Sequence, residues 1–237
     1  MKTITSFNNA LIEYSAKERM LKPLALYYLV KAKFNHSIIF NYTPNKLAKM
    51  TGLHHKTVVR YVKRLMDEKL VEFRDGHLTF KKSTVEGFTT KLPTAPYTSF
   101  EGILDRIHYI ILINNKAKQA YNIAVKYGHY ADLLNARARK KAIRNARIQD
   151  PTLESITKPV ITVRNASKLF NTSIPTAANI INSLEKKKYL KLKGYVKIIG
   201  RMPKSKYHDG SYFASNGLLF RYLGRIITIG AYLESKT

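Results

Sequence analysis

The chain has 237 residues, 45% of them hydrophobic, which is enough to bury a sizeable core and excludes an intrinsically disordered protein. Its 42 Lys and Arg residues stand against 15 Asp and Glu, and the formal net charge of +27 predicts a polyanionic partner, first of all nucleic acid. Because the sequence has no cysteine, it excludes disulfides, thiolate metal ligands and a cysteine nucleophile.

The hydropathy pattern predicts a soluble protein without a membrane partner. No apolar run approaches the roughly 18 residues that a membrane span needs, and the polar residues that follow the start of the chain do not form a signal-peptide core. We therefore expect a cytoplasmic protein, associated with the nucleoid or, for a viral protein, located in the host cell.

The N-terminal third begins, by pattern, with a helix and a short strand. Apolar residues at helical spacing predict a buried support helix over Glu18–Phe34. The run Ser37–Tyr42 is β-branched and aromatic, which is typical of a strand. Thr43 and Pro44 then provide an N-cap and a first helical residue, and they predict a helix over Asn45–Met50.

A third helix and a hairpin follow in the same third of the chain. The second helix is predicted to end at Thr51-Gly52, and apolar periodicity predicts the third helix over His55–Lys69. Asp75-Gly76 is a strong tight-turn dipeptide, and it lies between two runs of strand character, Leu70–Arg74 and His77–Phe80. We therefore expect a β-hairpin directly after the third helix.

The order of helix, strand, helix, tight turn, helix and β-ribbon has a counterpart in known proteins. The residues that carry the likeness are Leu47-Ala48-Lys49-Met50-Thr51-Gly52-Leu53, then Lys56-Thr57-Val58, then Leu65, Leu70 and Val71. Together they resemble the winged helix-turn-helix DNA-binding proteins over roughly Leu21 to Lys81, about a quarter of the chain. The resemblance implies that fold and DNA binding, but it does not specify a biological role.

Residues 83–150 are predicted to form a basic helical connector. The stretch Thr89–Pro96 is typical of a linker or loose extended segment. Ser99 opens a helical region that continues as far as Gly128, and a second helix is predicted over Tyr130–Arg147. The last part of that second helix carries cations and no acid, which favours phosphate contact over a merely solvated face. The cations that we select there as DNA-binding candidates are Arg137, Lys140, Lys141 and Arg144.

The pattern of the first third returns near residue 156, which indicates an internal duplication. Val160–Val163 has strand character, Arg164–Phe170 is predicted to be a helix, and Asn171-Thr172 a turn. Ser173 then serves as the N-cap of a helix that runs to Leu184.

The duplication extends to a predicted second hairpin. Superposing Leu184 on Leu65 brings Thr176 onto Thr57. Leu190–Lys193 and Tyr195–Ile199 alternate as hairpin strands do, with Gly194 as the turn between them.

The C-terminal tail is predicted to contain further β-structure. Asn216-Gly217 is a strong hairpin signal between two aromatic runs, and Arg225–Ile229 has the character of another strand. The predicted fold class is therefore α+β, mainly helical, with two winged helix-turn-helix domains joined by a helical connector. The predicted boundaries are 1–82 for the first domain, 83–150 for the connector, 151–200 for the second domain and 201–237 for a C-terminal β-hairpin tail.

The third helix is the first candidate recognition helix. Residues placed every 100° put Val58, Val59, Val62, Leu65 and Met66 on one side, which we expect to face the core. The other side is cationic, and Arg and Lys reach guanine O6 and N7 or phosphates in a major groove, although an ordinary solvated basic face is the alternative. The DNA-binding candidates of this domain are Lys46, His55, Lys56, Thr57, Arg60, Lys63, Arg64, Arg74 and His77.

The second candidate recognition helix is neutral on its exposed side. Asparagine pairs bidentately with adenine N6 and N7, while lysines around the following hairpin hold phosphates. A neutral face is also suited to protein contact, including dimerisation, so both alternatives stay open. The DNA-binding candidates of this domain are Thr176, Asn179, Asn182, Lys186, Lys187, Lys191 and Lys193.

The motifs of the common enzyme classes are missing from the sequence. The seven histidines show no metal-ligand spacing, and neither a glycine-rich phosphate loop nor a Gly-x-Ser-x-Gly elbow is present. We therefore expect no catalytic residue, no metal and no cofactor.

These patterns together predict sequence-specific binding of double-stranded DNA, with transcription regulation as the first role. The tandem arrangement also resembles the replication initiators of plasmids and phages, which implies binding to origin repeats as an alternative. A different class is a DNA-packaging, structural or interaction protein without sequence preference. Besides duplex DNA, the candidate partners are a second copy of the chain and the replication or transcription machinery.

Overall fold

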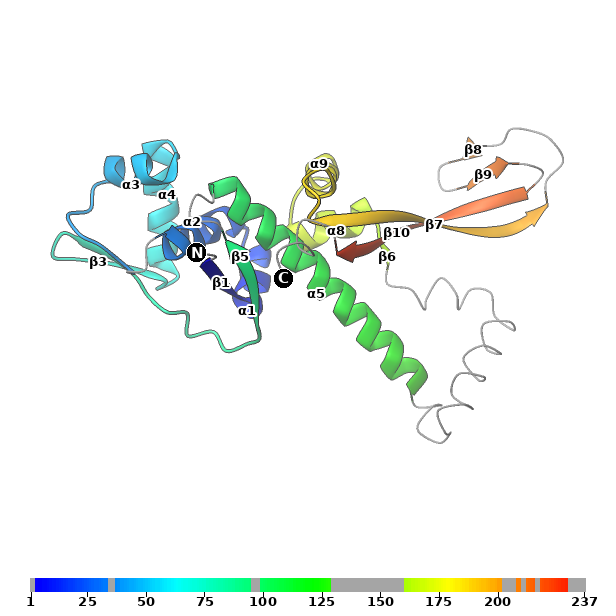
Figure 1. Ribbon diagram of the computed structural model, residues 1–237, viewed down its shortest axis with the longest axis horizontal. Helices are drawn as coiled ribbons and strands as arrows, with labels where there is room; N and C mark the ends of the chain where they lie inside the picture. Colours follow the sequence, from blue (N-terminus) through cyan, green and yellow to red (C-terminus); the bar gives the residue numbers. More distant parts are fainter. Residues whose placement is uncertain are drawn as a thin grey trace.

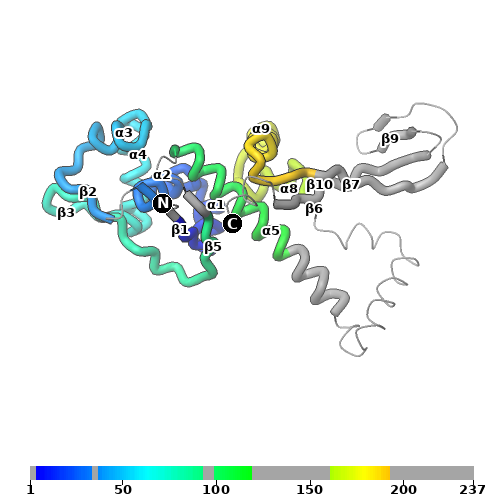
Figure 2. Tube along the Cα trace, viewed as in Figure 1, coloured from blue at the N-terminus to red at the C-terminus, as the bar shows by residue number. Residues whose placement is uncertain are grey.

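The protein has an α+β fold with small antiparallel sheets (Figure 1). Figure 2 shows helix α5 (Phe100–Gly128) running between the N-terminal elements and a second group of helices. The computed structural model describes residues 3–33, 37–94, 99–128, 160–201, 208–209, 212–215 and 218–229.

The first elements are strand β1 (Thr3–Asn8) and helices α1 (Asn9–Lys17) and α2 (Leu21–Lys33). The side chain of Asn8 accepts a hydrogen bond from the Leu11 amide at 3.0 Å, and this N-cap starts α1. Most residues of α2 are buried, so the expected support helix is confirmed, although it begins later than predicted. The sequence patterns predicted neither β1 nor α1.

The segment expected to be a linker or loose extended stretch forms strand β5 (Thr89–Thr94) instead. It pairs antiparallel with β1, with Phe7 opposite Thr90 in the register. The expectation of an unpaired stretch was wrong because the partner strand lies more than eighty residues away in sequence. The pairing joins the start of the chain to the segment that leads into α5.

The helix, tight turn, second helix and β-hairpin predicted for residues 44–80 are confirmed as local elements. Thr43 accepts a hydrogen bond from the Lys46 amide at 3.1 Å, and Pro44 stands at the first helical position. Asp75 and Gly76 both have positive φ, 50° and 74°, as a tight hairpin turn requires. The elements are β2 (Ile38–Ile39), α3 (Pro44–Thr51), α4 (His55–Asp67), β3 (Val71–Arg74) and β4 (His77–Phe80), with the strands in the order β2-β4-β3.

The buried side of α4 differs from the prediction in part. Val59 and Met66, which we expected in the core, are 46% and 40% exposed. Tyr61 is buried instead and stacks on Phe100 of α5 with ring centroids 6.2 Å apart. The core therefore contacts α4 on a stripe rotated toward Tyr61, because α2 packs against α4 and Phe100 of α5 stacks on Tyr61.

Helix α5 confirms the predicted helical region up to Gly128. Ile103, Ile107 and Ile110 are buried, and α5 packs against α1 and α2 as well as against α8 and α9 (Figure 1). One helix thus belongs to the core beneath both groups of elements.

The second group repeats the geometry of the first. Thr162 caps α8 (Val163–Phe170) and Ser173 caps α9 (Ile174–Lys186), each by accepting a hydrogen bond from a backbone amide of the first turn. Strand β6 (Val160–Ile161) precedes them. The helix starts and the turn predicted for this region are confirmed.

A shift of 119 residues carries the first helix pair onto the second. Residue 44 becomes 163 and residue 55 becomes 174, so that α3 and α8 have equal lengths, as do α4 and α9. The same shift relates the left-handed helix caps Gly52 and Asn171. It also relates Lys69 and Lys188, which have φ of 56° and 60° just after the second helix of each pair. The predicted duplication therefore holds at the level of local backbone geometry.

The predicted second hairpin, with its turn at Gly194, was wrong. The chain continues through Gly194 as strand β7 (Leu190–Arg201), which pairs along its length with β10 (Leu218–Ile229). A lone glycine does not supply a two-residue turn, and Gly194 lies within β7, where it pairs with Arg225 of β10.

The strands of the C-terminal tail belong to the same sheet as β7. Strand β9 (Tyr212–Ser215) pairs with β10, with Ser215 opposite Leu218, as the predicted hairpin around residues 216–217 requires. The segment predicted as a further strand, Arg225–Ile229, is the end of β10 and pairs with β6 and β7. Strand β8 (His208–Asp209) pairs with β9. Within the described part of the chain, no helix is both long and apolar enough to cross a membrane.

A buried histidine lies where the two helix groups meet. His108 of α5 is 6% exposed and packs on Phe170 of α8, with ring centroids 4.9 Å apart. Burial lowers the pKa of His108 from 6.5 to about 4, and the charge of Lys22 acts in the same direction.

We expect the free energy of unfolding to fall as the pH is lowered from 6.5 to about 4. The unfolded chain binds the His108 proton near pH 6.5 and the folded chain only near pH 4, so the stabilisation is complete above pH 6.5 and is lost as the pH falls to 4. The loss is about 3 kcal/mol for this one group. Urea unfolding of the wild type and of His108→Phe across pH 4 to 7 measures it. Parallel pH profiles of the two proteins would contradict the assignment.

Candidate nucleic-acid interface

Helix α4 carries a stripe of cations on its solvent side, which we call the α4 cation stripe: Lys56, Arg60 and Lys63. The three residues are spaced by four and three positions, so they lie along one side of the helix, and all are exposed. Among the described residues, no carboxylate forms an ion pair with any of them. Their charges are therefore available to an external anion.

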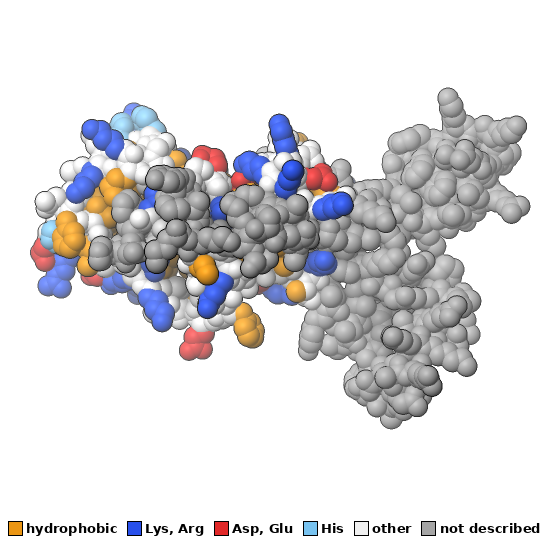
Figure 3. Space-filling model, viewed as in Figure 1, with side chains coloured by type: hydrophobic (Ala, Val, Ile, Leu, Met, Phe, Trp, Pro, Cys, Tyr) orange, Lys and Arg blue, Asp and Glu red, His pale blue; other side chains and the backbone are white. Residues whose placement is uncertain are grey.

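Neighbouring candidates frame the stripe. His55 is exposed at the first position of α4, and Thr57 is half-buried beside Lys56. Lys46 of α3 is exposed and donates a hydrogen bond from Nζ to the Phe40 carbonyl at 2.7 Å. Hydrophobic, histidine and cationic side chains lie together on the visible surface of this end of the molecule (Figure 3).

The last cation of α4 has acidic partners of its own. Arg64 Nη2 lies 3.3 Å from a carboxylate oxygen of Glu68 and 3.9 Å from one of Glu18. Tyr14 donates a hydrogen bond to the other oxygen of Glu68 at 2.8 Å. Since these contacts offset the charge of Arg64, we leave it out of the α4 cation stripe.

The β3–β4 ribbon carries two further candidates at the end that holds its turn. The Arg74 side chain is 82% exposed, and its Nε lies 3.4 Å from a carboxylate oxygen of Asp75, which is equally exposed. His77 is half-buried, accepts a hydrogen bond at Nδ1 from the Asn41 amide and contacts the ring of Phe40. Both residues lie at the end of the ribbon that carries the Asp75-Gly76 turn.

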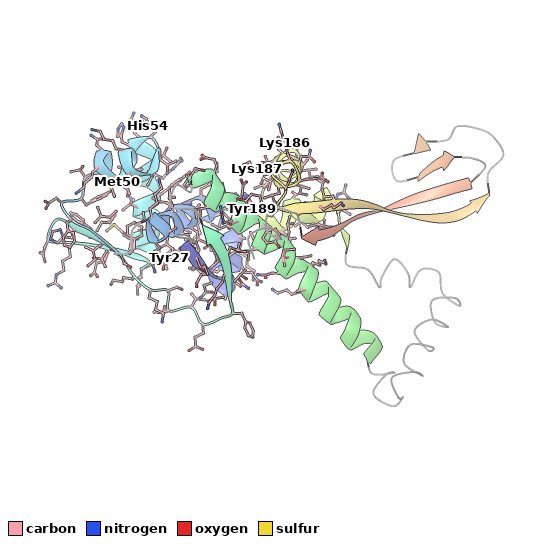
Figure 4. All side chains as sticks on the ribbon, in the orientation of Figure 1. Tyr27, Met50, His54, Lys186, Lys187 and Tyr189 are labelled. Atoms are coloured by element: carbon pink, nitrogen blue, oxygen red, sulfur yellow. The ribbon has the colours of Figure 1, made fainter. Side chains whose placement is uncertain are left out.

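Helix α9 presents amides where α4 presents cations. Under the shift of 119 residues, Arg60 corresponds to Asn179 and Lys63 to Asn182, and both asparagines are exposed. Thr176 corresponds to Thr57, and its hydroxyl shares a hydrogen bond of 2.8 Å with Ser173. Figure 4 shows His54, before α4, and Lys186 of α9 along the same edge of the molecule.

The lysines after α9 do not form one group. Lys186 and Lys191 are exposed, and Lys193 lies in β7. Lys187 Nζ lies 2.5 Å from Asp105 Oδ2, so this lysine neutralises a carboxylate of α5. The ion pair attaches the end of α9 to α5. The sequence did not indicate this structural role of Lys187.

We expect Lys187→Met to destabilise the protein by about 1–2 kcal/mol. The variant leaves the Asp105 carboxylate, whose side chain is 12% exposed, without its cation. Because the Lys187 side chain is half-exposed, water screens the ion pair and the loss of stability stays moderate. Urea unfolding measures the difference, with Lys186→Met as the matched control on the exposed neighbour. Equal stabilities of the two variants would show that the ion pair contributes nothing measurable.

Several candidate residues lie outside the described residues. They are Arg137, Lys140, Lys141 and Arg144, together with the helix predicted over Tyr130–Arg147. The described residues also contain no group of three or more His, Asp or Glu side chains placed to hold a metal ion. The described candidate residues therefore lie mainly on α4, α9 and the β3–β4 ribbon.

Comparison of the chain with protein-family models, with curated proteins and with solved structures found no match. Function is therefore inferred from the charge and geometry of the residues described above.

Proposed function

We propose that this protein binds double-stranded DNA sequence-specifically through two winged helix-turn-helix units and acts as a transcription regulator. The observation that supports the proposal most strongly is the α4 cation stripe. It lies on the second helix of a helix-turn-helix, directly before a β-ribbon, and is free of carboxylate partners among the described residues. A helix with such a side fits a major groove, where Arg and Lys contact guanine or phosphate.

The charge of the whole chain supports the same partner. A net charge of +27 attracts a polyanion and speeds its association, and each phosphate contact releases counterions from the duplex. This term gives affinity without sequence preference. The specificity that we propose must come from base contacts by the recognition helices.

Helix α9 supplies the second set of base contacts in this proposal. Asn179 and Asn182 are exposed at the positions that match Arg60 and Lys63, and an asparagine amide recognises adenine by two hydrogen bonds. Lys186 at the end of α9 serves as a phosphate contact. The first unit therefore provides most of the attraction, and the second provides hydrogen-bonding discrimination.

The tandem repeat favours replication initiation as a second candidate role. The helix pairs α3–α4 and α8–α9 have matching helix lengths, and such a repeat is suited to binding two parts of one origin repeat. Transcription regulation needs only the binding itself, which is why we place it first.

Selection of bound fragments from random duplex DNA, repeated at two salt concentrations, tests the proposal. A short enriched motif supports a regulator, and repeated motifs at fixed spacing support an initiator. Binding without enrichment would contradict sequence-specific recognition and would favour a packaging or scaffold role. Absence of binding at both salt concentrations would contradict DNA binding altogether.

Single substitutions separate base contacts from phosphate contacts. We expect Arg60→Ala and Asn179→Ala to change the order of preference among selected sequences, each by about 1–3 kcal/mol at its own base pair. Lys186→Ala should weaken binding to all sequences alike, because phosphates are the same at every step. Competition binding with selected and scrambled duplexes measures both effects. A uniform loss for all three variants would contradict base readout.

A further inference from the structure

The tip of the β3–β4 ribbon exposes aromatic rings. Phe40 is 57% exposed and Phe73 is 49% exposed, although both belong to residue types that usually lie in the core. Phe40 contacts His77 edge-to-face with ring centroids 5.0 Å apart, and Tyr42 contacts Phe73 in the same manner at 5.9 Å. We call these four residues the aromatic tip.

The two aromatic pairs lie on opposite faces of a thin ribbon. Phe73 is directly opposite Leu78, so its side chain points to the face on which Leu78 is buried. His77 is the neighbour of Leu78 along β4 and therefore points to the other face, where Phe40 contacts it. The end of the ribbon thus has an apolar ring on each side of its backbone.

The conformation of the tip is well defined by hydrogen bonds. The Tyr42 amide donates to the Gly76 carbonyl at 2.8 Å, and the Asn41 amide donates to His77 Nδ1 at 3.3 Å. These bonds attach the segment before α3 to the turn between β3 and β4. The rings are therefore held on a rigid support rather than on a loose loop.

Two cations and one carboxylate flank the aromatic tip. The Lys46 ammonium donates a hydrogen bond to the Phe40 carbonyl, and the Arg74 side chain lies 3.4 Å from the equally exposed Asp75 carboxylate. Because Arg74 and Asp75 offset each other, the net charge of these three groups is the positive charge of Lys46, which complements a nucleic acid. Nucleobases offer both the flat apolar faces that stack on rings and the phosphates that bind cations.

We propose that the aromatic tip inserts a phenylalanine ring between base pairs in the minor groove beside the groove that α4 occupies, and that it bends the duplex there. This inference rests on the proposed function. Proteins that bend DNA use apolar wedges in this way, and the Lys46 ammonium beside Phe40 compensates for phosphates that the bend brings closer together. Bending of the duplex would be a second effect of the protein, separate from base recognition by α4 and α9.

Ring closure of a short linear duplex tests the inference. The probe is a fragment of about 120 base pairs, shorter than the persistence length of about 150 base pairs, which DNA ligase circularises slowly unless a protein bends it. We expect the wild type to accelerate circularisation about tenfold or more. Phe40→Ala/Phe73→Ala should lose this acceleration and keep most of the affinity, measured by fluorescence anisotropy on the same fragment.

The control is another exposed phenylalanine, which lies outside the aromatic tip. Phe88 lies in the loop before β5 and is 90% exposed, so Phe88→Ala removes the same ring from another surface and should circularise like the wild type. Phe40→Leu/Phe73→Leu keeps an apolar wedge and should restore bending, which separates loss of the wedge from loss of folding.

The outcomes distinguish the inference from the proposed function. Wild-type protein that binds the fragment without accelerating circularisation would overturn the bending inference and leave DNA binding intact. Equal acceleration by the wild type and the alanine double variant would assign the bend to other residues and overturn the role of the tip. Wild-type protein that does not bind the fragment at any salt concentration would overturn both proposals.

Discussion

Replacing Lys56, Arg60 and Lys63 together by alanine is expected to weaken binding to a duplex by at least about 100-fold at moderate salt. The three side chains form the α4 cation stripe, and their exposure leaves them accessible to phosphates and base edges. The dependence of the logarithm of affinity on the logarithm of salt concentration should become shallower by about two, since the loss of Lys56 and of Lys63 each removes a phosphate contact that releases about one counterion, whereas Arg60 contacts a base. Titrations of a fluorescent duplex at four salt concentrations measure both quantities.

The control for this prediction removes the same charge elsewhere. Lys22 of α2, Lys82 after β4 and Lys91 of β5 are exposed, and none belongs to the candidate interface. Their triple alanine variant should retain most of the affinity, because long-range attraction between exposed charges is largely screened at physiological salt. Equal losses for the two triple variants would indicate that the net charge alone determines binding, without a located interface.

Leu65→Ala and Leu184→Ala are each expected to destabilise the protein by about 2–5 kcal/mol. The two leucines are related by the shift of 119 residues, and both are fully buried near the end of the second helix of their pairs. Each deletion leaves a cavity that surrounding side chains refill only in part. Because α5 packs on α8 and α9 and also on α2, which itself packs against α4, we expect one cooperative urea transition that either variant shifts.

Val59→Ala provides the matched surface control on α4. Val59 is 46% exposed, so its truncation should change the unfolding free energy by less than about 1 kcal/mol. A cost for Val59→Ala as large as that for Leu65→Ala would contradict the observed orientation of the helix. Two separate transitions, one for each leucine variant, would show that α5 does not couple the helix pairs.

Signals that act within a few residues allowed much of the fold to be predicted from the sequence. Thr43 and Pro44 start α3 because a side-chain cap and a fixed φ favour the first helical turn. Asp75-Gly76 closes its hairpin because both residues accept positive φ. Ser173 caps α9 for the same reason as Thr43 caps α3.

Features that depend on distant contacts were not predictable. The pairing of β1 with β5 and that of β7 with β10 join segments whose partners no local pattern reveals. The same limit applies to the candidate site. The sequence placed Lys187 among phosphate contacts, but the carboxylate of Asp105, more than eighty residues earlier, lies beside it. Exposed aromatic residues at the ribbon tip were likewise visible only once the strands were paired.

Cutting of DNA from a single introduced cysteine tests most directly whether α4 contacts the duplex. The chain has no cysteine of its own, so Lys63→Cys and Lys82→Cys each give one attachment point for a thiol-linked iron chelate that cleaves nearby DNA. Our account predicts strong cutting at a few adjacent nucleotides of a selected duplex from position 63 and little from position 82. Strong cutting from position 82, with none from position 63, would show that the duplex lies on another surface of the protein.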